Sequence, residues 1–193
     1  MARLSQPYVF RPAIAADFPM LRRWRDSAEV LPWWGPWQHP EAEFAAHLAD
    51  RAMSLWIVEL AGRPFAFAQD YACHAWDPHP FSYLPAGSRG VDLYIGEPDM
   101  LDRGHGSALL RQRCDRLFAA GVPAIGTDPS PHNVRAIRAY EKAGFVVVSG
   151  PVIRPGAAPS SWNAGRTRIG PRRRPDAPMP RRHERTEAKT TFL

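Results

Sequence analysis

The chain has 193 residues, of which 45% are hydrophobic, and this length favours one domain with a single hydrophobic core. Its two cysteines, Cys73 and Cys114, are too few for a disulfide framework and lack the spacing of metal ligands. The sequence contains no run of about 18 apolar residues, the length that a membrane span needs. We therefore expect a cytoplasmic protein with no membrane association.

The positive charge is concentrated near the end of the chain. The formal net charge is +6, but residues 1–150 carry 15 Lys and Arg against 16 Asp and Glu. Residues 151–193 carry 10 against 3, together with many prolines and little apolar periodicity. We divide the chain into a folded domain over residues 1–150 and a Pro/Arg-rich tail over residues 151–193, which buries too little apolar surface to fold.

The first half begins with a predicted strand over Tyr8–Pro12. A helix follows over about residues 17–27, with Asp17 as its cap and apolar residues at three-residue spacing behind it. Residues 30–40 contain prolines and a glycine that argue against regular structure, and three tryptophans that offer flat, rigid faces. Glu41–Met53 is again in helical register, which predicts a second helix.

The rest of the domain alternates between segments with the pattern of a strand and segments with the pattern of a helix. A hairpin with a turn at Gly62 and Arg63 is followed by a loop over residues 74–88. We expect strands over Leu55–Leu60, Phe65–Tyr71, Val91–Gly96, Val122–Thr127 and Phe145–Ser149, and helices over Gly104–Ala120 and Pro131–Ala143.

One short segment has the chemistry of a phosphate site. Arg103-Gly104-His105-Gly106-Ser107 lies between a strand and an amphipathic helix, where unpaired backbone N–H groups and the helix dipole attract anions. The segment lacks the lysine of a P-loop and one glycine of a dinucleotide fingerprint. Because glycines also begin helices for steric reasons, this segment alone leaves both interpretations open.

A second motif makes the interpretation specific. Asn133, Ala136-Ile137 and Tyr140-Glu141-Lys142-Ala143-Gly144-Phe145 resemble the closing motif of the GNAT superfamily of N-acetyltransferases. Other segments are similar, in the same order, to motifs of the aminoglycoside 6′-N-acetyltransferases. They are Trp33-Trp34-Gly35, Phe67-Ala68-Gln69-Asp70-Tyr71, Gly90-Val91-Asp92 and Thr127-Asp128-Pro129-Ser130-Pro131. The resemblance spans about residues 8–150.

The resemblance implies an α/β fold in which helices flank a mixed, mostly antiparallel sheet. Acetyl-CoA would lie in the splay between the Val91–Gly96 and Val122–Thr127 strands. The implied activity is acetyl transfer from acetyl-CoA to the 6′-amine of an aminoglycoside, a reaction of antibiotic resistance. We expect a small-molecule amine as the partner, no metal, and a monomer or homodimer.

The resemblance also assigns roles to residues. Asp92 is the carboxylate that helps to remove the proton of the amine, and Tyr140 is the proton donor to the departing thiolate. Acetyl-CoA would contact Leu93, Tyr94, Ile95, Arg103, Gly104, His105, Gly106, Ser107, Asn133, Ala136 and Tyr140. The amine substrate would contact Trp33, Trp34, Gln69, Tyr71, Asp92 and Asp128, with Glu97 or Asp99 extending the acidic wall.

Each assignment has a structural alternative. Asp92 could be a solvated acid at a strand edge, Asp128 a turn residue, Tyr140 part of the core, and the two tryptophans a cap on one end of the core. His74 and His79 share a loop but have no third ligand at metal spacing.

Other functions are open to the same residues. A siderophore precursor or another small amine could be the acceptor, and a fold relative could bind CoA without transfer. The tail could bind nucleic acid through Arg172–Arg174 and Arg181–Arg182. We do not expect a nucleic-acid partner, because the tail has almost no aromatic residues for base stacking.

Two features depart from the family pattern. Leu101 stands where the superfamily usually has Gln or Arg, and residues 151–193 offer no candidate for the last strand of the sheet. One back-translation of residues 153–168, read after skipping two bases, encodes Ser-Thr-Trp-Gly-Arg-Ala-Val-Val-Met, an alternating run typical of a strand. We hypothesise that a frameshift near residue 152 replaced the native terminus; a native disordered tail is the alternative.

Overall fold

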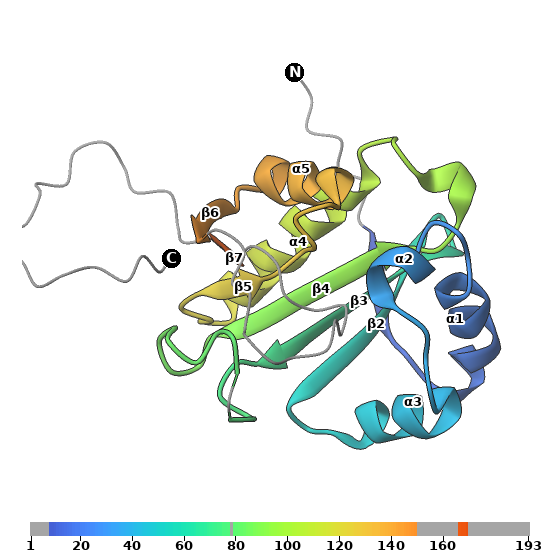
Figure 1. Ribbon diagram of the computed structural model, residues 1–193, viewed down its shortest axis with the longest axis horizontal. Coiled ribbons are helices and arrows are strands. Elements are labelled where there is room, and N and C mark those ends of the chain that lie inside the picture. The colour runs from blue at the N-terminus through green and yellow to red at the C-terminus, as the bar shows by residue number, and fades with distance from the viewer. Residues whose placement is uncertain (1–7, 78, 150–165, 170–193) are drawn as a thin grey trace, which may run out of the picture.

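The computed structural model describes residues 8–77, 79–149 and 166–169, and one seven-stranded sheet runs through them (Figure 1). The strand order is β1-β2-β3-β4-β5-β7-β6, and within these residues β4 and β5 form the parallel pair while the other neighbours are antiparallel. The strands are β1 (Val9–Pro12), β2 (Met53–Leu60), β3 (Arg63–Ala72), β4 (Arg89–Ile95), β5 (Ile125–Thr127), β6 (Val146–Ser149) and β7 (Arg166–Ile169).

Helices cover both faces of the sheet because successive strand residues point to opposite sides. Ile57 and Phe67 pack with Leu21 on one face, whereas Val58 packs with Leu109 on the other. Among the described residues no helix is both long and apolar enough to cross a membrane. The α-helices are α1 (Phe18–Arg25), α2 (Leu31–Trp34), α3 (Pro40–Ala49), α4 (His105–Ala119) and α5 (Val134–Ala143), with 3₁₀ turns at Ala15–Asp17 and Pro98–Met100.

The two sides of β4 are paired to very different lengths. On the β3 side the register runs without interruption from Ala66 opposite Ile95 to Ala72 opposite Arg89. On the β5 side only Arg89 and Gly90 have partners, Ile125 and Gly126. The strands therefore separate beyond Gly90. This confirms the mixed, mostly antiparallel sheet with flanking helices, and it provides the splay that the family resemblance implies.

Several element boundaries differ from the predictions. Helix α3 ends at Ala49 rather than Met53, because Asp50 adopts an extended ψ of 115° and its carboxylate accepts a bond from the Ala52 N–H (2.8 Å). One helical turn, α2, forms in the segment for which we expected no regular structure, because a proline is tolerated in the first turn of a helix. Strand β5 begins at Ile125, since Pro123 has no N–H for the ladder.

Asp17 lies at the predicted position but has a different partner. It directly precedes α1, yet its carboxylate makes no capping bond to that helix. Instead it accepts two bonds from the Arg11 guanidinium (2.7 and 2.8 Å) and one from the Ile14 N–H (2.9 Å). Asp17 therefore ties the first strand to the turn before the helix.

The expectation that no residue after 150 supplies a strand is wrong. Strand β7 lies between β5 and β6 and is antiparallel to both, with Thr167 opposite Thr127 and Val147. Ladder hydrogen bonds are made by the main chain, so this pairing requires no apolar periodicity. The predictions on the remaining tail, including its arginine clusters and the frameshift point, fall outside the described residues.

Candidate active site

A cavity of about 410 Å³ lies where β4 and β5 separate. Its walls come from β4, from the start of α4 and from α5, with Trp33 and Trp34 of α2 on a further side. Arg103 and Tyr140 are not part of its lining. The predicted cofactor residues that the structure brings together here are Leu93, Tyr94, Ile95, Gly104, His105, Gly106, Ser107, Asn133 and Ala136.

The first turn of α4 leaves its N–H groups free for an anion. Gly104 occupies the cap position with φ 81° and offers no side chain, while the Ser107 hydroxyl turns back to the Gly104 carbonyl (3.1 Å). A Cβ placed on Gly106 would lie 3.7 Å from Ala139 Cβ, an ordinary contact. Helix packing therefore does not require glycine at 106; its missing side chain leaves the cavity open beside these N–H groups. The site fits a pyrophosphate.

Three cations of α5 line the same cavity, and we did not predict them. Arg135, Arg138 and Lys142 recur at i, i+3 and i+7, a spacing that places them on one side of the helix. Arg135 also lies 3.9 Å from Asp102. The helical spacing was the signal available in the sequence. Together with the α4 N-terminus, these side chains make the cavity suitable for a polyanion.

Asp92 lies on the fully paired side of β4 and is only 5% exposed. Gln69, directly opposite on β3, donates from Nε2 to Asp92 Oδ2 (3.0 Å), and Tyr71 also hydrogen-bonds to this carboxylate. Burial raises the pKa of Asp92 to about 6, against the opposing effect of these two bonds. Asp92 is thus not a solvated strand-edge acid, and its pKa suits a proton acceptor near neutral pH.

Tyr140 lies in the core and also near the carboxylates. Its ring packs edge-on against Phe145, with centroids 5.1 Å apart, and the residue is 6% exposed. Burial raises the pKa of Tyr140 far above its usual value, and the charges of Asp92 and Asp128 raise it further. The phenol therefore stays protonated at neutral pH. Asp128 acts on Tyr71 in the same way, so these side chains share one electrostatic environment.

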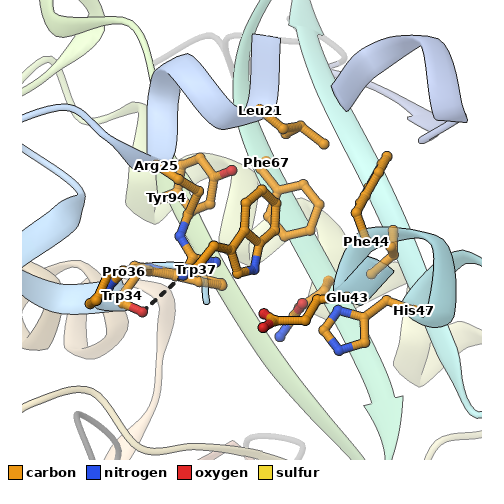
Figure 2. A pocket seen from close by; sticks show the side chains of 12 residues that line it. Leu21, Arg25, Trp34, Pro36, Trp37, Glu43, Phe44, His47, Phe67 and Tyr94 are labelled. Carbon is orange, nitrogen blue, oxygen red and sulfur yellow. Dashed lines mark hydrogen bonds between the residues drawn. The ribbon is translucent and has the colours of Figure 1, made fainter. Parts of the chain in front are cut away.

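A second cavity, of about 240 Å³, lies between α1, α3 and the sheet (Figure 2). Gln69 lines it and connects it to Asp92, and Trp34 lines both cavities. Figure 2 shows Glu43 and His47 of α3 on the side away from Trp34. The predicted substrate residues thus lie in three places. Trp33 and Trp34 line the first cavity, and Gln69 lines the second together with Trp34. The third place is the buried carboxylate of Asp92, with Tyr71 and Asp128 near it.

Two predicted acids of the substrate wall form ion pairs with arginines. Glu97 Oε1 accepts bonds from Arg23 and from the Trp24 indole (both 2.8 Å), and Asp99 pairs with both terminal nitrogens of Arg63 (2.7 and 2.8 Å). Neither acid lines the two cavities, and the expected extension of the acidic wall stays a prediction.

The two histidines of the 74–88 loop bind main-chain groups. His79 Nδ1 accepts a bond from the Phe81 N–H (3.1 Å), and His74 Nε2 lies 3.1 Å from the Ser82 carbonyl. Within the part of the chain that the structure describes, no group of three His, Cys, Asp or Glu side chains could hold a metal ion.

The chain is similar to known acetyltransferases in both sequence and structure. Residues 13–150 match the family described as "Acetyltransferase (GNAT) domain". Aminoglycoside N(6′)-acetyltransferase type 1 of Klebsiella pneumoniae is 35% identical over 138 residues, covering 67% of this chain and 69% of that protein. A kanamycin resistance protein of Rhizobium radiobacter is 48% identical over 60 residues, covering 31% of this chain and 56% of that protein.

Among solved structures, aminoglycoside acetyltransferase AAC(6′)-Ib in complex with paromomycin and acetyl-CoA matches with a TM-score of 0.74 at 31% identity. The match covers 88% of this chain and 99% of that one. The matched family spans most of the sheet, both cavities and the buried carboxylate. The chain therefore belongs to the GNAT family of acetyltransferases.

Proposed function

We propose that this chain transfers the acetyl group of acetyl-CoA to the 6′-amine of aminoglycosides. The observation that supports this most is the position of the buried Asp92 relative to two cavities. Leu93, the next residue of β4, lines the open splay, and Gln69, which hydrogen-bonds to Asp92, lines the aromatic cavity. Its relatives in sequence and structure are aminoglycoside acetyltransferases. Because acetyl-CoA is an intracellular metabolite, we also propose that the enzyme acts in the cytoplasm.

Acetyl-CoA would be held by the residues of the larger cavity. The free N–H groups at the start of α4 would bind its pyrophosphate, and the cations of α5 would balance the phosphate charge. The main chain of Leu93–Ile95, which has no strand partner on the β5 side, would supply N–H groups to the thioester carbonyl. When bound, acetyl-CoA supplies an activated acyl group.

Asp92 would prepare the acceptor. An amine with a pKa well above 7 is mostly protonated, so the carboxylate first binds the ammonium and then takes its proton. Gln69 and Tyr71 orient the carboxylate, and burial keeps its pKa close enough to neutrality for this exchange. We assign Tyr140, whose phenol stays protonated at neutral pH, as the donor to the leaving sulfur, because it lies on α5, the helix that lines the larger cavity.

The aromatic residues would bind the sugar rings. Trp34 packs edge-on against Tyr94, with centroids 4.9 Å apart, and lines both cavities. An indole face stacks well on a sugar ring, whereas a linear polyamine gains less from it. This arrangement favours an aminoglycoside over a small amine as the acceptor.

Thiol release from acetyl-CoA tests the proposal. The acceptors are a kanamycin with a 6′-amine, an analogue with a hydroxyl at that position, and spermidine. We expect turnover with the first and little with the other two. Turnover with spermidine alone would replace the aminoglycoside by a small amine, and equal turnover with the 6′-hydroxyl analogue would move the reaction to another amine.

A further inference from the structure

Arg25 is a buried cation in the wall of the smaller cavity. It is the last residue of α1, four positions after Leu21 and next to Trp24, so it lies on the face that packs against the sheet. The residue is only 8% exposed. Arginines are rarely buried to this extent, because a charge loses its hydration there.

Arg25 makes hydrogen bonds and ring contacts with the tryptophan loop, residues 33–37. One terminal nitrogen, Nη2, donates to the Trp34 and Gly35 carbonyls (2.9 and 3.0 Å). The guanidinium carbon lies 5.2 Å from the ring centroid of Trp34 and 4.5 Å from that of Trp37 (Figure 2). The cation is thus held by two carbonyl dipoles and two π-faces.

These contacts leave the charge incompletely satisfied. Nε is buried without a hydrogen-bond partner, and among the described residues no carboxylate forms a salt bridge with Arg25. Burial lowers the pKa of the guanidinium from its usual value, although Glu43 acts to raise it. The contacts of Arg25 therefore offset the cost of burying its charge only in part, which favours a role beyond stability.

The rings of the tryptophan loop also pack on the core, because Trp34 lies edge-on against Tyr94 and Trp37 stacks on Phe18, whereas Arg25 binds the main chain of the loop. The loop includes the end of α2, a single helical turn. Gly35 follows that turn and has a φ of 66°, in the left-handed region. Arg25 binds the carbonyls at this exit, where helical bonding ends. Because Trp34 lines both cavities, a shift of this loop would reshape the wall at which an acceptor ring stacks.

We propose that Arg25 is a positioning residue for the acceptor, which fixes Trp34 and Trp37 by bridging their loop to α1. This inference rests on the proposed acetyl transfer to a ring-bearing amine. Arg25 does not reach the reacting atoms through the contacts described, so its loss weakens acceptor binding more than it slows the chemical step.

The test compares Arg25→Met with Arg25→Lys and with the control Arg22→Met. Arg22 lies on the same helix, but its side chain is 56% exposed and forms an ion pair with Asp26 (3.6 Å). In Arg25→Met we expect the KM for kanamycin to rise about tenfold, the effect of losing one or two cation–π contacts. We expect kcat to stay within about twofold, because Asp92 and its partners are unchanged.

The other variants separate positioning from folding. Arg25→Lys keeps the cation over the rings but loses the planar fork, so it recovers part of the KM. Arg22→Met leaves KM unchanged. The melting temperature of Arg25→Met falls by no more than a few degrees, because relief from burying a charge offsets the two lost carbonyl bonds in part. Acrylamide quenches its tryptophan fluorescence more strongly because the loop opens.

Failure of the proposed function and failure of the positioning role give different results. If the wild type does not acetylate any aminoglycoside, the proposed function fails, while acrylamide quenching of Arg25→Met still tests whether Arg25 holds the loop. If the wild type is active and Arg25→Met keeps both its KM and its quenching, the positioning role is wrong. A lowered melting temperature with an unchanged KM would assign Arg25 to folding instead.

Discussion

The two flanks of β4 have opposite properties. Towards β3 the strand is paired along its whole length, and this side holds the buried carboxylate with Gln69 and Tyr71. Towards β5 only Arg89 and Gly90 are paired, and this side holds a large cavity with basic residues. The paired flank is suited to fixing side chains in place, whereas the open flank presents main-chain groups and space to a ligand.

This difference separates the two demands of the proposed reaction. Proton transfer needs groups held within a few tenths of an ångström, and a continuous ladder provides that rigidity. Binding a long polyanion needs unpaired N–H groups, and an interrupted ladder next to a helix N-terminus provides them. A single strand thus carries two functions because its two edges are paired differently.

Blocking the open flank should have the largest effect. In Gly106→Val the branched side chain fills the space beside the first turn of α4, and we expect acetyl-CoA binding and turnover to fall below detection. Gly106→Ala is the matched control for folding, since its Cβ makes ordinary contacts. Calorimetric titration with acetyl-CoA measures the effect. Binding by Gly106→Val with normal affinity would place the pyrophosphate elsewhere.

Disturbing the paired flank should slow turnover and leave acetyl-CoA binding intact. The Tyr71 ring lies directly over Gly90, so the Cβ of Gly90→Ala would overlap the ring and displace it from Asp92. We expect kcat to fall about 10- to 100-fold, as for a small misplacement of a catalytic group. Tyr71→Phe removes the hydroxyl without crowding the strand and should lower kcat in the same direction. An unchanged kcat in both variants would show that Tyr71 does not orient the carboxylate.

The smallest expected effect lies at the start of β4, before the two flanks part. Ser88 is buried, and its hydroxyl has no hydrogen-bond partner among the described residues. Ser88→Ala should therefore raise the free energy of unfolding by about 1 kcal/mol. Chemical denaturation measures this change, and a clear destabilisation by Ser88→Ala would reveal a partner for the hydroxyl.

Local patterns were sufficient for much of the open flank. Apolar spacing and a following glycine predicted α4 to within about two residues, and Gly121 does adopt a positive φ of 88°. The glycine segment before it and the Asn133 motif were expected to meet, and both line the same cavity. These features depend on neighbours in the chain, which a sequence displays directly.

Features that depend on distant partners were not predicted. Arg25 follows Arg22 and Arg23 in the sequence, and such a run of arginines is typical of an exposed helix face. Its contacts with the tryptophans around residue 35 explain its burial. Glu97 was expected to extend the acidic wall of the substrate site, but it pairs with arginines more than 30 residues away. Strand β7 pairs through its main chain, which leaves no side-chain pattern to read. The frameshift hypothesis stays a prediction, and sequencing of the gene around the codon for residue 152 tests it.

The pH dependence of turnover in Asp92→Asn and the wild type tests the division of roles between the two flanks most directly. Because burial raises the pKa of Asp92 to about 6, the wild type should lose kcat as the pH falls through that value and the carboxylate becomes protonated. Asp92→Asn should be about 100-fold slower or more, lack this acidic limb, and bind acetyl-CoA as tightly as the wild type. The exposed Asp115→Asn is the control. Full activity of Asp92→Asn, or loss of its acetyl-CoA binding, would contradict the assignment of proton transfer to the paired flank and cofactor binding to the open one.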